Sequence, residues 1–135
     1  MSEPRPLVLQ FVRTVADAEL ARGGGTSDSD AAQQIMKRLY DELATLLGPA
    51  GFDALVARSL MLARRVHPTL AGVSVASGGT LVGLGDPPGE RVERAQGALA
   101  IVAHFIELLV VLVGADLTMV LMRDIWPLPA EEEKT

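Results

Sequence analysis

The stretch AIVAHFIELLVVLVGADL, residues Ala100 to Leu117, decides the fold because it is apolar over most of a helical circumference. Ile101 to Val113 would span about 20 Å as an α-helix, short of the roughly 30 Å hydrocarbon core of a membrane. A full-length span would contain Glu107, which already lies inside this stretch, and an intramembrane carboxylate costs on the order of 2.5–3.5 kcal/mol. We therefore expect no membrane span. The stretch predicts the central helix of an all-α bundle, surrounded by neighbouring helices or by a second subunit.

Apolar residues at helical spacing predict further helices on both sides of this one. The predicted helices span residues 6–21, 30–47, 51–66, 86–113 and 115–126. Pro6 suits a first helical turn, and Ser29 or Asp30 is the expected N-cap of the second helix. Gly48-Pro49 and His67-Pro68 are the expected stops after the second and third helices.

The segment Ala71 to Gly89 differs in character, with six glycines and two prolines. Gly78-Gly79 suits a tight turn, so we predict a small hairpin between Val73–Ala76 and Thr80–Leu84. A two-stranded hairpin is marginal by itself, and we expect this one to contribute little to stability. Asp86 and Pro87 are then the expected N-cap and first turn of the long helix.

Charge and composition exclude several classes of function. The formal net charge of −5 argues against nucleic-acid binding, which needs a basic face. The chain has no cysteine, so disulfides, thiolate metal sites and cysteine catalysis are excluded. The N-terminal sequence lacks a secretory signal pattern, and arginine outnumbers lysine 10 to 2. We expect a cytoplasmic protein from a GC-rich bacterium.

His104 and Glu107 lie three residues apart on one helical face and are the first candidates for a functional site. A di-iron carboxylate bundle needs Glu-x-x-His on two helices with further glutamates, and this chain has one pair in reversed order. His67, the other histidine, lies at a predicted helix C-terminus, where a positive charge is favourable. This structural role is sufficient to explain it. We therefore expect no metal and no catalysis here, but an interhelical polar contact or a polar contact in a ligand pocket.

Arg58 and Arg123 each lie on a helix that is largely apolar nearby. Glu107, Asp116 or Asp124 could pair with them, and we expect partly buried ion pairs that fix helix register. Capture of a carboxylate or phosphate by one of these arginines is the alternative.

The last predicted helix carries more apolar surface than one face can bury. Its expected inward stripe is Leu117, Val120, Leu121 and Ile125. Met119, Met122 and Trp126 would then form an exposed row of the kind that marks interaction sites. These three residues are the candidate interface of a symmetric homodimer. The alternative is that the first helix covers them within the monomer.

The sequence thus predicts a single helical domain over residues 1–128, with about five helices, a hairpin insertion at roughly 71–89 and an acidic tail at 129–135. The expected function is a non-catalytic, self-associating interaction or regulatory module, acting on itself or on another protein without a cofactor. The alternative is a helical domain that binds a small apolar ligand. An enzyme of unknown class ranks third, because no nucleophile with a base and no phosphate-binding loop is recognisable.

Overall fold

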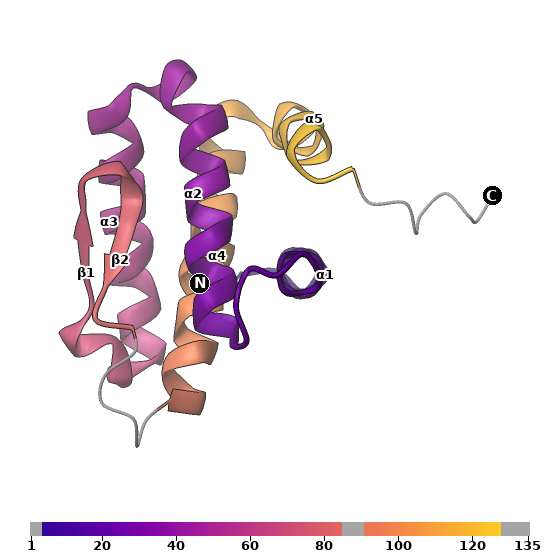
Figure 1. The fold of residues 1–135 in the computed structure, drawn as a ribbon. Helices are drawn as coiled ribbons and strands as arrows, with labels where there is room; N and C mark the ends of the chain where they lie inside the picture. The colour runs from indigo at the N-terminus through magenta and orange to yellow at the C-terminus, as the bar shows by residue number, and fades with distance from the viewer. Residues whose placement is uncertain (1–3, 85–90, 128–135) are drawn as a thin grey trace.

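The computed structural model describes residues 4–84 and 91–127 and shows an all-α domain (Figure 1). The helices in these ranges are α1 (Pro6–Ala21), α2 (Asp28–Leu47), α3 (Pro49–Val66), α4 (Arg91–Val113) and α5 (Ala115–Ile125). The predicted fold class and the order of its helices are confirmed. The predicted cap at Asp86 and Pro87 and the acidic tail at 129–135 lie outside the described residues.

Helix α4 is the centre of the fold. It contacts α1, α2, α3 and α5, and every residue from Ala100 to Ile106 is buried. In Figure 1, α2, α3 and α4 run lengthwise, whereas α1 and α5 are seen nearly end-on. Among the described helices, only α4 is long and apolar enough to cross a membrane, over Val92–Val113, and half of that stretch is buried in the protein. This burial is compatible with the core helix that the sequence predicts.

Two glycines form the corners between consecutive helices, and their backbone geometry is nearly the same. Gly48 has φ 82° and ψ 148°, and Gly114 has φ 95° and ψ 155°. Each glycine N–H closes the preceding helix, bonding to Ala44 O or Val110 O. Each glycine carbonyl then accepts the first hydrogen bond of the next helix. Positive φ favours glycine, so both corners depend on this residue type.

Helix α2 begins two residues earlier than predicted, and its N-cap is Ser27 rather than Ser29 or Asp30. The Ser27 hydroxyl accepts a hydrogen bond from the Asp30 N–H, and the Asp30 carboxylate accepts from the Ser27 N–H. This reciprocal pair is a capping box with aspartate in place of glutamate. Ser29 instead lies buried on the first turn.

The hairpin forms where the glycines predicted it. Strands β1 (Ser74–Ala76) and β2 (Thr80–Val82) pair antiparallel across a 3₁₀ turn, η2 (Ser77–Gly79), and a second 3₁₀ turn, η1 (Pro68–Gly72), leads into them. The hairpin packs on the helices, because Leu81 is buried and Gly79 lies against Phe52, and its small contribution to stability stays a prediction. The Gln33 side-chain amide also both donates to Leu81 O and accepts from Leu81 N, as a neighbouring strand would.

Candidate functional site

A cavity of about 390 Å³ lies between α1, the C-terminal end of α3 and the N-terminal half of α4. Its apolar lining residues are Pro4, Leu9, Val12, Val66, Leu99 and Ala100. Its polar lining residues are Arg13, Asp28, His67, Gln96 and His104. The volume falls in the range of small-molecule sites, which are mostly apolar with a few polar groups. This cavity is the best candidate for a binding site in the described residues.

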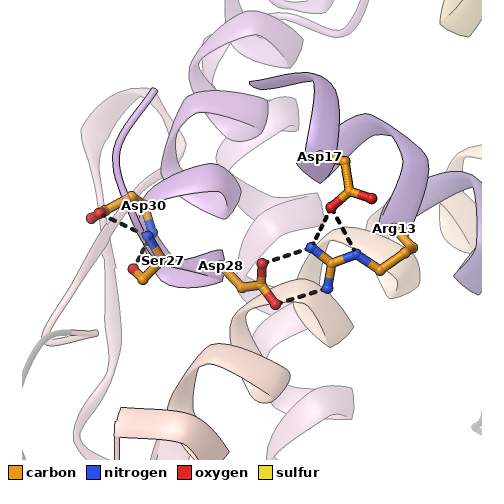
Figure 2. Close-up of polar contacts among 5 residues, drawn as sticks. All are labelled: Arg13, Asp17, Ser27, Asp28 and Asp30. Carbon is orange, nitrogen blue, oxygen red and sulfur yellow. Dashed lines mark hydrogen bonds and ion pairs between the residues drawn. The ribbon is translucent and has the colours of Figure 1, made fainter. Parts of the chain in front are cut away.

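Arg13 and Asp28 form a two-pronged ion pair at the cavity (Figure 2). The two guanidinium end nitrogens lie 2.8 and 2.7 Å from the two Asp28 oxygens. Asp17, one turn along α1, accepts from the Nε and from one end nitrogen of the same arginine. The hydrogen bonds that Arg13 donates to Asp28 lower the pKa of Asp28, and the same bonds are the main reason that the pKa of Arg13 is raised. The pair therefore stays ionised around neutral pH.

Both histidines of the chain line this cavity. His104 lies in the middle of α4 and is 4% exposed, and His67 is the residue at which α3 ends. They are 37 residues apart in sequence, so no local motif predicts that they line the same cavity. The His67 backbone N–H bonds to Ala63 O at the end of α3, and the favourable side-chain charge predicted for His67 at this helix end stays a prediction.

Glu107 makes the interhelical contact that the sequence predicted for the His104–Glu107 face. Its Oε2 accepts from the Arg5 backbone N–H at 2.8 Å and from the Arg5 Nε at 3.0 Å. Partial burial acts to raise the pKa of Glu107, but the hydrogen bonds and charge of Arg5, helped by His104, outweigh it and lower that pKa. The pair joins the start of α1 to the middle of α4.

Arg58 and Arg123, predicted to be partly buried, are both exposed. Neither forms an ion pair with another residue in the described ranges. The prediction failed because each arginine lies on the solvent side of its helix, whereas the apolar neighbours in sequence turn inward. Arg58 is therefore no longer a candidate site residue.

The inward face of α5 is only partly the one predicted, since Leu121 and Ile125 pack against the core but Leu117 and Val120 do not. Thr118, Met122 and Trp126 are 1%, 1% and 2% exposed, whereas Met119 is 45% exposed. The expected inward residues Leu117 and Val120 are instead on the surface. Phe11 of α1 meets the Trp126 ring edge-on, so the first helix does cover this row. Met122 and Trp126 are core residues, and of the proposed interface only Met119 remains at the surface.

The outward face of α5 is a short apolar strip with opposite charges at its ends. Asp116, Met119, Val120 and Arg123 follow a spacing of three, four and seven residues, which places them on one helical face. All four are exposed. Val111 and Leu112, 83% and 57% exposed, add apolar surface at the adjoining end of α4. Exposed apolar side chains therefore lie together on the outward face of α5.

Glu19, a buried carboxylate on α1, was not predicted from the sequence. Its Oε2 accepts hydrogen bonds from the Nε of Arg38 on α2 and from the Nε1 of Trp126 beyond α5. Arg13 and Asp28 were not predicted as site residues either. The Arg13–Asp17 spacing of four residues could have predicted an ion pair on one helical face. The partners of Glu19 are too distant in sequence to predict.

Comparison with protein-family models, curated proteins and solved structures finds no match to this chain. Among the described residues, no group of three histidine, aspartate or glutamate side chains is placed to hold a metal ion. The cavity and the α5 strip are the features of the described residues that bear on function.

Proposed function

We propose that this chain is a non-catalytic helical interaction module that self-associates through the outward face of α5. The observation that carries the proposal is the exposed strip of Asp116, Met119, Val120 and Arg123. Surface-exposed methionine and valine on one face, joined by Val111 and Leu112 of α4, are what a partner would bury.

The strip is self-complementary, which favours a second copy of the chain as the partner. Asp116 and Arg123 lie at equal distances on either side of the Met119–Val120 centre. Two α5 helices packed antiparallel about a two-fold axis would therefore bring Asp116 against Arg123 of the partner subunit, and this contact would occur twice. The apolar centre would supply most of the affinity, and the charges would fix the register.

The charge of the chain and the burial of α4 also bear on its partners and on its location. A net charge of −5 supports the absence of nucleic-acid partners. The burial of half of the apolar α4 stretch supports a core helix over a membrane span. We accordingly propose a bacterial, cytoplasmic protein that needs no cofactor for association.

Charge reversal tests the proposed pairing directly. Asp116→Arg and Arg123→Asp would each place like charges in contact at both ends and should weaken the dimer about tenfold. The double reversal restores opposite charges and should restore the dimer. Light scattering over a concentration series reads the mass, and circular dichroism checks that each variant is folded.

A role for these charges within one chain gives a different pattern. Asp116 and Arg123 also suit the two ends of the α5 dipole, so both single reversals would weaken the helix slightly. The double reversal would then be the worst variant rather than a rescue. Such a result, or masses unchanged by all three variants, would contradict the proposal. Val92→Glu, an exposed valine at the other end of α4, is the matched control and should leave the mass unchanged.

A further inference from the structure

A second cavity, of about 340 Å³, lies between one face of α2 and the turn of the hairpin, and we call it the hairpin cavity. Its volume falls in the range of small-molecule sites. The polar side chains that line it and are used below are Gln34, Lys37, Tyr40 and Asp41 of α2 and Thr80 of β2.

The hairpin cavity differs from the cavity beside Arg13 in how many of its polar groups are already bonded. Arg13 and Asp28 are bonded to each other, and His104 acts on Glu107, so nothing in that larger cavity selects a ligand. In the hairpin cavity, the Gln34 amide and the Tyr40 and Thr80 hydroxyls make no hydrogen bond with any residue that the structure describes. An amide and a hydroxyl each both donate and accept. A ligand would therefore bond these three groups without breaking a contact within the protein.

Lys37 and Asp41 add one donor group and one acceptor group to the hairpin cavity. The Lys37 Nζ lies 3.8 Å from the Asp41 Oδ2, longer than an ordinary hydrogen bond, and both side chains are more than half exposed. Such an exposed pair contributes little to stability and leaves most of the hydrogen-bonding capacity of both groups unused. Because the two charges are opposite, the lining of the cavity carries no net charge.

The Tyr40 ring gives the hairpin cavity an apolar surface among these polar groups. It packs edge-on against Phe52, with the ring centroids 5.2 Å apart, and this contact holds the ring in place. On the other side the cavity is lined by the backbone of Gly78, where an added Cβ would meet nothing within 4 Å. A ligand can therefore approach the main chain of the turn closely.

Beyond self-association, we propose that the hairpin cavity binds a compact ring with several hydroxyl groups, of the size of one sugar unit. The hydroxyl groups bond to Gln34, Asp41 and Thr80, and the C–H face of the ring lies against Tyr40. A hydroxyl both donates and accepts, so several of them on one ring match a lining that offers both kinds of group and no net charge. No residue of α5 lines this cavity, so ligand binding and dimer formation can be tested separately.

Methyl β-glucopyranoside, cyclohexanol and glycine are the probes, because they offer several hydroxyl groups, one hydroxyl group and a pair of opposite charges. Tyr40 is the only tyrosine of the chain, so isotope-labelled tyrosine reports on this cavity alone in nuclear magnetic resonance spectra. The glucoside should shift the Tyr40 ring signals and saturate at millimolar concentration. Cyclohexanol and glycine should bind about tenfold more weakly, because each leaves most of the polar lining groups unbonded.

Variants at two neighbouring acidic residues locate the site. Asp41 lines the cavity, whereas Glu42, exposed on the same helix, does not. Asp41→Ala should weaken glucoside binding about threefold to tenfold, and Glu42→Ala, which removes the same charge, should leave it unchanged. Asp41→Asn keeps an acceptor without the charge, so it should bind the glucoside within about twofold of the wild type.

Four results would overturn the inference. Cyclohexanol binding as tight as that of the glucoside would show that the cavity does not recognise several hydroxyl groups. Tighter binding of glycine, lost in Asp41→Asn, would show that Lys37 and Asp41 capture a zwitterion. Equal effects of Asp41→Ala and Glu42→Ala would show that the glucoside binds elsewhere. Tyr40 signals unmoved by the glucoside would show that the cavity is not a site for such a ring, and would leave the dimer proposal to its own test.

Discussion

The indole Nε1–H of Trp126 donates a 2.8 Å hydrogen bond to Glu19 Oε2, across 107 residues of sequence. The same carboxylate accepts from Arg38, so one buried side chain joins α1, α2 and the end of α5. A buried carboxylate is costly without such partners. This contact orients α5, and it thereby determines that Met119 and Val120 face solvent.

Trp126→Phe should test this link, because it removes the N–H donor and part of the buried ring. We expect the free energy of unfolding to fall by about 2–4 kcal/mol in urea denaturation. Tyr40→Phe removes a hydroxyl that has no hydrogen bond among the described residues, and it should change stability by about 0.5 kcal/mol or less. Equal effects of the two variants would show that the Glu19 contact is unimportant.

Glutamate substitutions at two methionines three residues apart on α5 should have different effects on folding. Met122→Glu places a carboxylate at a side chain that is 1% exposed and should abolish cooperative unfolding. Met119→Glu places it at a side chain that is 45% exposed, and the monomer should remain folded. Thermal melting followed by circular dichroism distinguishes them. A folded Met122→Glu protein would disprove the orientation of α5.

The hairpin contains a matched pair of glycines that separates backbone strain from steric contact. Gly78 and Gly79 have φ of 78° and 73°, so alanine at either position incurs roughly 1–2 kcal/mol of left-handed strain. A Cβ at Gly78 meets nothing within 4 Å, whereas one at Gly79 would lie 2.4 Å from Phe52 Cε2. Gly79→Ala should therefore be the more destabilising, by about 1–3 kcal/mol. Equal losses in urea denaturation would show that the hairpin is not packed on α3.

The Arg13–Asp28 pair should make a contribution to the free energy of unfolding that is lost in acid. Asp28 has a lowered pKa in the folded chain, chiefly because of the hydrogen bonds from Arg13. Its contribution is therefore present above the ordinary pKa of 3.8 and is lost as the pH falls through the folded-state pKa. The pair is part-exposed, so we expect about 1 kcal/mol or less. Unfolding measured from neutral pH downward should show the wild-type advantage over Asp28→Asn shrinking below about pH 4.

Arg13→Gln provides the check on that interpretation. It removes the donors that lower the pKa of Asp28, so its stability should lose the same acid-dependent step. A wild-type advantage that grows toward low pH would contradict the sign of the effect.

The helices could be predicted from sequence because their signals are local. Apolar spacing, Pro6, Gly48 and Gly114 defined the element boundaries to within a few residues. The choice of face on α5 could not be predicted in this way, since Leu117 and Val120 are as apolar as the residues that are buried. Thr118 can be buried because its hydroxyl bonds to Gly114 O, and Trp126 is fixed by a carboxylate from α1.

The cavity could not be predicted from the sequence either, because its lining residues come from different elements. Its polar residues come from α1, α2, the end of α3 and α4, and only tertiary packing brings them together. His104 was recognised as a polar contact on the central helix. The pairing of Arg13 with Asp28, and the position of His67 in the same cavity, depend on how α1 crosses α2 and α4.

Sedimentation equilibrium of the wild-type chain measures self-association through α5 without any substitution. We expect a reversible dimer at twice the 14.3 kDa chain mass, populated at high micromolar concentration. The dimer should be lost in Val120→Glu, which places a charge at the two-fold centre on both copies. Val92→Glu should sediment as the wild type does. A wild-type protein that remains a single 14.3 kDa species throughout the high micromolar range would show that the chain does not self-associate through α5.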